Sequence, residues 1–396
     1  MFTIFNRYVL RELLSLFAVA LIALTMIMII QGVVQEAIRM NLGLGPMLRL
    51  IPFVVPNALV FAVPGTILFA VCMLYGRMSA DNEIVALKAL GIGPRVVMMP
   101  AFVVGFLLSL LTVWLIDVAY SWAYLEAQRV IVQSVEEIAY GMLRTQRNYS
   151  NQRFSIIVKG VEGHKLMYPI ITFQPEGDMP GFTLTADNAE LHSNLERNTL
   201  RLILTNSELE TSNGVQASFP GVMEREIPLS FASARGEVVA GPAQIALRNI
   251  PSEVEKQLRV VRETEQAIAA DTGFLLATGD LAFLHHHHWF GHEQELVHHK
   301  RRLTRLRVEP WRRWSAGFSC LCFVIVGTPL AIWRKNADYM TTFFYCFLPT
   351  LLLYYPLMMM ALDRSKAGDW PPYSLWLPNV AMLIAGWVLI RKVERY

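Results

Sequence analysis

Three long apolar segments precede a polar stretch of about 195 residues, and three more apolar segments follow it. The hydrocarbon core of a bilayer is about 30 Å thick, so a helix needs roughly 20 apolar residues to cross it. The segments comprise residues 13–34, 51–75, 96–116, 314–333 and 340–362, which meet that length, and residues 373–390, which fall slightly short but are adequate. We predict a polytopic α-helical membrane protein with six transmembrane helices, arranged 3+3 around one large inserted domain.

The charges of the short loops set the expected orientation, because segments rich in Lys and Arg resist translocation. If both termini are cytoplasmic, ten basic residues lie inside and four lie in the short outer loops. The inner ten are Arg7, Arg11, Arg77, Lys88, Arg95, Arg334, Lys335, Arg391, Lys392 and Arg395, and the outer four are Arg39, Arg49, Arg364 and Lys366. This bias and the even number of spans favour cytoplasmic termini and an inserted domain outside.

The first span is predicted to remain as an anchor, because it runs to 22 residues without a small-residue cleavage site at its end. All four cysteines, Cys72, Cys320, Cys322 and Cys346, fall inside predicted spans, so no disulfide framework supports the inserted domain. The formal net charge of +3 is too small to imply a nucleic-acid partner.

Residues from about 150 to 245 alternate apolar and polar side chains with a period of two, which suits strands with one buried face. Phe154, Ile156 and Val158 follow this pattern, and Ser212-Asn213-Gly214 supplies turn chemistry between two runs. We predict an all-β, jellyroll-like domain, a sandwich of about eight short strands. It is either an inert ectodomain or a platform whose edge or groove receives a ligand or a partner's strand.

Helical spacing returns over residues 252–310, where Leu258 and Val261 begin an amphipathic pattern. We expect one or two helices leading to the fourth span, with a break at Gly273 or Gly279. The chain therefore divides into the first three spans (1–122), the β domain (123–250), a helical connector rich in His and Arg (251–312) and the last three spans (313–396).

Seven of the nine histidines gather in this connector, at positions His285, His286, His287, His288, His292, His298 and His299. His288 and His292 lie one helical turn apart and are the candidates for a metal pair, but a solvated polar patch near the headgroups explains the cluster equally. Zinc sites usually draw ligands from separate elements, and no cysteine or well-spaced second cluster is present. We therefore predict no metal site.

A basic run follows the histidines and is opposed only by Glu309. It consists of Lys300, Arg301, Arg302, Arg305, Arg307, Arg312 and Arg313. Long basic side chains form a snorkelling collar at a membrane surface, and they also attract the phosphates of lipid headgroups. The two interpretations are compatible, and the second makes Arg313 a candidate for substrate binding.

The sequence contains none of the motifs that would indicate catalysis. It has no G-x-x-x-x-G-K-[ST] for nucleotide, no H-E-x-x-H for zinc and no G-x-S-x-G for a nucleophilic serine. Ionisable residues inside spans usually mark proton or ion paths, but Asp117 and Asp363 sit at span ends. We expect no enzyme activity, no cofactor in this chain and no proton-driven transport.

The loop between the second and third spans has the most specific local pattern in the sequence, that of a short amphipathic helix. Residues 79–91 form a short amphipathic stretch, with Ser79 as the expected N-cap and Gly91 as the expected end. Its acidic residues fall in the first turn and Lys88 in the last, which complements the helix dipole. Such a helix either fits the groove of a soluble cytoplasmic partner or lies passively at the interface.

These features together resemble the lipopolysaccharide-export permeases LptF and LptG. The opening Arg7-Tyr8-Val9-Leu10-Arg11-Glu12 is similar to the family's R-Y-x-x-R-E start, which leans towards LptF. Residues 82–91 resemble the coupling-helix pattern S-E-I-x-x-x-x-x-x-G, with Asn82 in place of Ser. Thr328-Pro329-Leu330 fits the fourth span's P-L, and Pro371-Pro372, Trp376-Leu377-Pro378-Asn379 and Gly386 fit the closing P-P…W-x-P-N…G.

The resemblance implies a permease subunit of an ABC transporter in the bacterial inner membrane. Two such permeases pair and bind a cytoplasmic ATPase dimer, which supplies ATP and magnesium. Spans one and five line a lateral opening for lipopolysaccharide, and the periplasmic jellyroll passes it to a bridge of similar jellyrolls. The ATPase-coupling residues are then Glu83, with Asp81, Lys88 and Arg77 beside it. The partners are lipopolysaccharide, membrane lipids and these proteins, and no nucleic acid.

The sequence departs from the family's pattern in two places, the outer end of span one and the connector. Gln35 stands where the family often has a basic residue at the outer end of span one, which leaves Arg39 as the nearest cation. Arg129, just beyond span three, is a second candidate for phosphate contact. The connector is also longer than the family's usual link.

Parts of the sequence also suit other functions. A multi-span enzyme that modifies envelope lipids would use the histidine cluster with a metal, and a noncatalytic scaffold would recruit periplasmic partners through the β domain. A four-span lipoprotein-release permease disagrees with the 3+3 arrangement.

Overall fold

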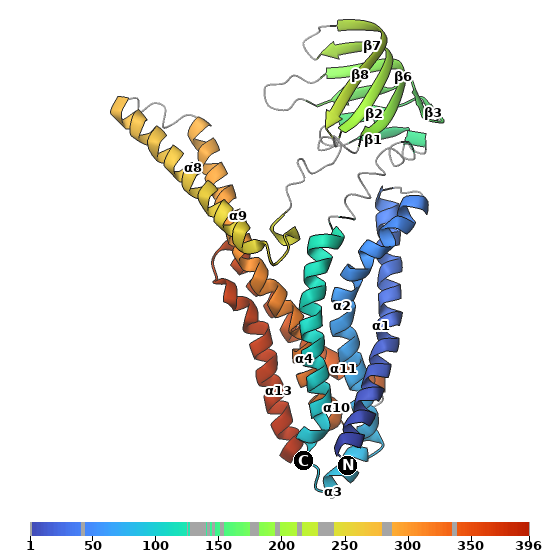
Figure 1. Cartoon of the computed structure of the whole chain (residues 1–396), viewed down its shortest axis with the longest axis vertical. Coiled ribbons are helices and arrows are strands. Elements are labelled where there is room, and N and C mark those ends of the chain that lie inside the picture. Colours follow the sequence, from blue (N-terminus) through green and yellow to red (C-terminus); the bar gives the residue numbers. More distant parts are fainter. Residues whose placement is uncertain are drawn as a thin grey trace. The chain divides into compact units, whose positions relative to one another are not determined.

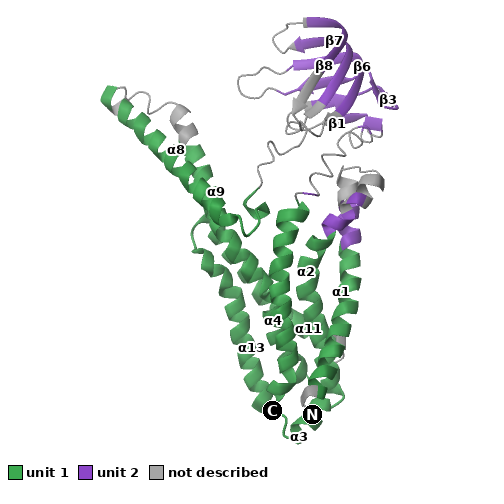
Figure 2. Ribbon diagram, in the orientation of Figure 1, with its two compact units in different colours: residues 1–28, 55–124, 241–396 green, residues 29–54, 125–240 purple. Residues whose placement is uncertain are grey.

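The structure, a computed structural model, describes most of the chain. The described residues are 2–40, 44–124, 126, 140, 143–144, 147–150, 154–174, 182–194, 199–211, 216–228, 241–278, 287–334 and 339–395. Two compact units divide it (Figure 2). The helical unit contains residues 1–28, 55–124 and 241–396, and the β unit contains residues 29–54 and 125–240.

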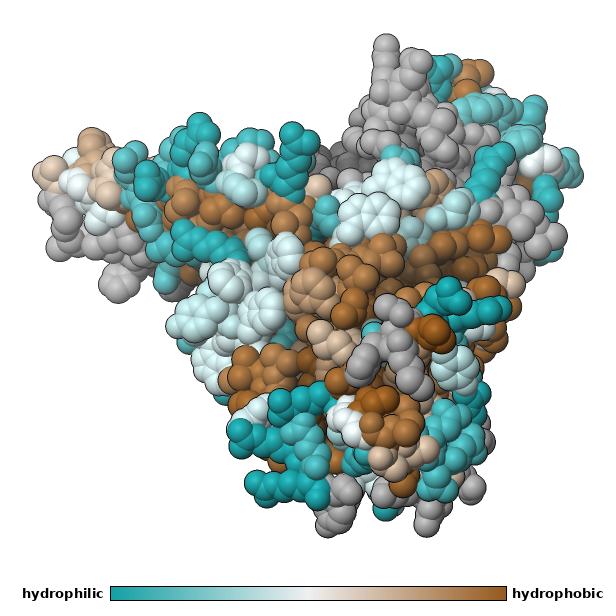
Figure 3. Space-filling view, turned by 60° about the horizontal axis from the view of Figure 1, so that its bottom comes forward, coloured by the Kyte–Doolittle hydropathy of each residue, from teal (hydrophilic) through white to brown (hydrophobic). Residues whose placement is uncertain are grey.

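Six helices among the described residues are long and apolar enough to cross a membrane, which confirms the predicted number of spans. The first three spans are α1 (Phe2–Met40), α2 (Leu44–Ala80) and α4 (Pro94–Val118), which ends in the π-turn η1 (Ala119–Ala123). The fourth span consists of α9 (His287–Gly317) and α10 (Ser319–Trp333), and the fifth of α11 (Tyr339–Pro349), the π-turn η4 (Thr350–Tyr354) and α12 (Tyr355–Ala367). The sixth is the 3₁₀ turn η5 (Pro372–Trp376) followed by α13 (Leu377–Arg395). Figure 3 shows broad hydrophobic areas on the surface of these helices, as contact with lipid requires.

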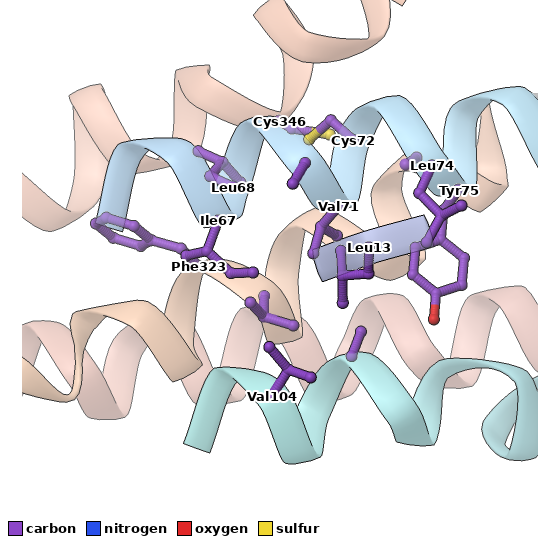
Figure 4. Packing of buried hydrophobic residues seen from close by; sticks show 14 of the residues in the cluster. Leu13, Ile67, Leu68, Val71, Cys72, Leu74, Tyr75, Val104, Phe323 and Cys346 are labelled. Carbon is purple, nitrogen blue, oxygen red and sulfur yellow. The ribbon is translucent and has the colours of Figure 1, made fainter. Parts of the chain in front are cut away.

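The core of the helical unit lies where α1, α2, α4 and α10 meet. Leu13, Ile67, Val71, Val104 and Phe323 are among its buried side chains (Figure 4). The outer spans join it by close approach of helix backbones, since a Cβ added at Gly386 of α13 would collide with Ile325 of α10. Small residues at such crossings increase van der Waals contact between helices in a bilayer.

The predicted connector forms an antiparallel pair of helices, α8 (Ile250–Thr278) and the first part of α9 (Figure 1). Val261 of α8 and Leu303 and Leu306 of α9 are buried in this unit. Gly273 lies inside α8, and the helix ends one residue before Gly279. The 3₁₀ turn η2 (Pro242–Gln244) precedes α8.

The β unit combines the adjoining ends of α1 and α2 with a separate antiparallel sheet, which confirms the inserted β domain. Its eight described strands are β1 (Asn148–Ser150), β2 (Phe154–Ile157), β3 (Gly160–Glu162), β4 (Lys165–Met167), β5 (Ile170–Phe173), β6 (Phe182–Asn194), β7 (Thr199–Thr211) and β8 (Gln216–Pro228). All pairings are antiparallel, and the order runs β1-β2-β5-β6-β4-β3, with β7 on the other side of β6 and β8 beyond it. One edge of β6 is shared, because residues 182–185 pair with β5 and residues 188–189 with β4.

This arrangement differs from the predicted sandwich of short strands, because β6, β7 and β8 each have 13 residues and all eight described strands join one sheet. A bulge lets the long strands bend without ending. Asn206 has a φ of 52°, and its side chain donates to Asp187 Oδ2 (2.9 Å) and accepts from the Gly221 N–H (3.1 Å). Bulges increase local twist and bend the strand, so the sheet curves around its buried side chains. Those side chains include Leu184, Leu191 and Leu202.

Candidate functional site

The predicted coupling helix is present but shorter than residues 79–91. Helix α2 continues to Ala80, and α3 spans only Glu83–Ala89. Ser79 is therefore not an N-cap. It is buried in the last turn of α2, where its hydroxyl donates to the Ile332 carbonyl (2.9 Å), a contact that only the fold supplies. Asn82 turns the chain between the two helices with a φ of 58°, in the left-handed region that Asn tolerates best after Gly.

The end of α3 follows the sequence prediction. Gly91 has a φ of 79°, its N–H donates to the Lys88 carbonyl (2.9 Å) and the Ile92 N–H donates to the Leu87 carbonyl (3.0 Å). This pair of bonds is a Schellman motif, which satisfies carbonyls that the helix end would otherwise leave open. Leu87 and Ile92 both pack against the core, which supplies the hydrophobic contact typical of the motif.

One side of α3 is anchored and the other is exposed. Ile84 is buried in the core of the helical unit, whereas Val85 is 42% exposed and Leu90 is 68% exposed. Glu83 is half-buried at the start of the helix, and Asp81 is exposed just before it. The helix lies at the same end of the helical unit as both termini (Figure 1). Helix α3 therefore has an acidic and apolar surface at the end of the helical unit that carries both termini.

Lys88 and Arg95 connect this region to the last span. The Lys88 ammonium donates to the Val393 carbonyl near the end of α13 (3.1 Å), where helix carbonyls lack partners within the helix. Arg95 forms an ion pair with Glu394, and its Nη2 donates to Glu394 Oε2 (2.9 Å). The Lys88 side chain, which the sequence assigned to ATPase coupling, is thus used within the chain.

Arg77 points to the first span. Its guanidinium forms an ion pair with Glu12 of α1, and its Nη2 donates to the Tyr8 hydroxyl (3.2 Å). All three residues lie close to the end that carries the termini, because Tyr8 and Glu12 fall in the first turns of α1 and Arg77 falls in the last turn of α2. Of the predicted coupling residues, Asp81 is exposed, Glu83 is half-buried, and Lys88 and Arg77 contact other helices.

At the other end of the helical unit, Arg313 is fully buried. It forms an ion pair with Asp117 of α4 and donates to the carbonyls of Ala243 (3.0 Å) and Ile245 (2.7 Å). The Leu247 N–H donates to the same Asp117 carboxylate (2.8 Å). Arg313 therefore joins spans three and four to the segment that enters α8, and its side chain is not at the surface where a lipid phosphate would meet it.

Glu309 and Arg312 complete this cluster. Arg312 donates to Glu309 Oε2 from Nε (3.0 Å) and Nη2 (2.8 Å) and lies 5.0 Å from the centre of the Tyr120 ring. Glu309 is also buried, and its Oε2 lies 3.8 Å from Arg313 Nε. Two acidic and two basic groups thus balance one another, which buried charges require.

The remaining predicted sites are less fully described. Gln35 is exposed on α1. Arg39 lies on α1 and His288 and His292 lie on α9, but their side chains are outside the described residues, as is all of Arg129. No group of three or more potential metal ligands occurs among the residues described.

Comparison with known proteins decides the family. The sequence model of the family described as lipopolysaccharide export system permease LptF/LptG matches residues 7–392. The chain belongs to the LptF/LptG family. No match is found among curated proteins. This LptF/LptG protein is therefore a permease subunit for lipopolysaccharide export and a multi-pass protein of the inner membrane.

The motifs that carry the resemblance have structural roles in this LptF/LptG permease. Asn379, at the start of α13, is buried and donates from Nδ2 to the Ser315 carbonyl of α9 (2.9 Å). Glu12 of the opening motif forms an ion pair with Arg77, and the Tyr8 hydroxyl accepts a hydrogen bond from it. Neither contact could be read from spacing, since each joins segments far apart in the sequence.

Proposed function

We propose that this LptF/LptG permease is a transmembrane subunit of an ABC transporter that extracts lipopolysaccharide from the inner membrane. A cytoplasmic ATPase dimer binds ATP and magnesium and acts on α3. The observation that carries the proposal is α3 itself, a short helix that anchors Ile84 in the core, begins at the half-buried Glu83 and leaves Asp81, Val85 and Leu90 exposed on or beside it. A helix with one fixed side and one exposed side suits the groove of a partner that pushes on it.

An external source of energy is physically necessary for this reaction. Moving an acyl chain out of the bilayer exposes apolar surface at a cost of about 0.8 kcal/mol per CH₂. Lipopolysaccharide has several such chains, and the sequence of this permease carries no nucleotide motif. A second LptF/LptG-type permease would complete the path, with α1 and the span formed by α11 to α12 lining a lateral opening between the two subunits.

The orientation is part of the proposal. The end with α3 and both termini carries most of the basic residues of the short loops, so it is assigned to the cytoplasm. The β unit then lies in the periplasm and passes lipopolysaccharide to a bridge of jellyroll proteins. Its strand β8 supports this role, because β8 pairs only with β7 among the described strands and exposes Phe219 and Val222. An edge of this kind accepts a partner's strand.

The experiment is co-purification of the ATPase with Glu83→Ala. The substitution removes the half-buried acidic side chain at the start of α3 and leaves Ile84 in the core, so we expect the permease to fold while ATPase binding and lipopolysaccharide-dependent ATP hydrolysis are lost. Glu255→Ala, an exposed carboxylate of α8, is the matched control and should behave as wild type. Normal ATPase binding and transport by the Glu83 variant would contradict the proposal.

A further inference from the structure

Helix α1 exposes more of its apolar stretch than the other helices of the core. Only 11% of its most apolar stretch is buried, compared with 61% for α2. Val9, Leu13 and Phe17 are buried near its beginning, but Ile22 and Ile27 further along are more than 60% exposed. Thr25 and Val33 further along are also buried, so contact with the rest of the permease is confined to one side of α1 and the remainder of its surface is exposed.

The same first turns carry a polar contact to α2. Arg77 pairs with Glu12 and donates to the Tyr8 hydroxyl. The second carboxylate oxygen of Glu12, Oε2, is buried and has no hydrogen-bond partner. Arg77 is therefore the cation that pairs with this carboxylate, whose side chain is 21% exposed, and loss of Arg77 would remove its counter-ion.

Arg77 stands directly before the coupling helix. Only Asp81 and Asn82 separate the end of α2 from α3, so a displacement of α3 is passed to the turn of α2 that holds Arg77. Arg77 thus lies on the short path from α3 to the beginning of α1.

The other connections of the loop lead to a helix that is firmly packed. Lys88 and Arg95 contact the end of α13. That helix is fixed against its neighbours by the close approach of Gly386 to Ile325 and by the hydrogen bond from Asn379. Of the two helices tied to the loop, α1 is the less buried, with 11% of its apolar stretch buried against 28% for α13.

We propose that the Arg77–Glu12 ion pair, supported by Tyr8, transmits displacement of α3 to α1. Arg77 and Glu12 are then positioning residues within the permease and not contacts to the ATPase. The inference rests on the proposed function, since it names how the ATPase-driven helix acts on the span that lines the lateral opening. A purely structural anchor would need the same contact, so the test must separate transmission from stability.

The test uses the full complex of permease, partner permease and ATPase in proteoliposomes containing lipopolysaccharide. Three quantities are measured: the ATPase retained on purification, the thermal stability of the complex and the lipopolysaccharide released per ATP hydrolysed. The variants are Arg77→Gln, Glu12→Gln, Arg77→Lys and the charge swap Arg77→Glu with Glu12→Arg. Arg95→Gln, which breaks the matched ion pair to α13, is the control.

We expect the two Gln variants to retain the ATPase and to hydrolyse ATP, while release per ATP falls at least about fivefold, the lower end of typical coupling between sites. Arg77→Lys keeps the charge and should retain most of the coupling. The charge swap should restore release towards wild type, and Arg95→Gln should keep the wild-type ratio.

The inference is overturned if the Gln variants keep the wild-type ratio, or if release follows thermal stability alone and the Lys and swap variants restore none of it. A wild-type complex that binds no ATPase would overturn the proposed function, and this inference with it. A wild-type complex that transports, together with Gln variants that also transport normally, would overturn the inference alone.

Discussion

At the scale of single residues, the buried charges separate structural from functional roles. Arg313 belongs to a basic run that the sequence offered for phosphate binding, yet its guanidinium is fully buried against Asp117 and two carbonyls. Arg301 and Arg305 of the same run are exposed on α9. The exposed members therefore remain available for headgroups, whereas Arg313 fastens the segment that enters α8.

Replacement of Arg313 by Met should destabilise the permease by about 1–3 kcal/mol, because it removes the donor of the partly buried Asp117 and of two backbone carbonyls, while Glu309 keeps Arg312. Thermal unfolding of the purified protein in detergent measures the change. Arg301→Met is the matched control from the exposed face and should cost less than about 0.5 kcal/mol. Equal stability of the two variants would show that the buried cluster contributes nothing to the fold.

At the scale of elements, α3 shows how a seven-residue helix holds its position. It is too short to be stable alone, since isolated helices below about 12 residues are marginal in water. Ile84 in the core and the Schellman motif at Gly91 supply what its length does not. These two contacts therefore hold α3 in a fixed position with one side exposed, as the transmission of force from a partner to the spans requires.

Gly91→Ala tests the Schellman motif. The position has a φ of 79° and open space around it, so the substitution adds backbone strain of about 1 kcal/mol without a steric clash. Hydrogen exchange at the Ile92 amide should accelerate roughly fivefold as the motif opens more often. Gly93→Ala is the control, because Gly93 has a φ of −68° and equally open surroundings. An unchanged exchange rate in the Gly91 variant would mean that the motif does not stabilise the helix end.

At the scale of the whole molecule, the central expectation is that α3 and the β unit face opposite compartments. Single cysteines introduced at Leu90 and Val222, both well exposed, report on this directly. A membrane-impermeant thiol reagent added to cells with a permeabilised outer membrane should label Val222→Cys and spare Leu90→Cys until the inner membrane is opened. The four native cysteines are buried and give a low background. Labelling of Leu90→Cys from outside would contradict the orientation.

The sequence by itself determined the features that depend on local chemistry. Six spans follow from the length of apolar segments, because the bilayer imposes that length on any helix that crosses it. The inserted β domain follows from period-two alternation, and the end of α3 follows from Gly91, because only glycine adopts that backbone conformation at little cost. Each of these signals lies within a few consecutive residues.

Only the tertiary structure decided which distant residues meet. The Ser79 hydroxyl donates to the Ile332 carbonyl and does not cap α3. Arg77 forms an ion pair with Glu12, and the Arg313 side chain is fully buried. The long strands of the β unit bend at Asn206 within one sheet, although their alternation alone suited a sandwich equally well. Charge and hydrogen-bonding capacity are properties of a residue, but the partner that satisfies them is set by how the helices and strands pack, and no local pattern records that choice.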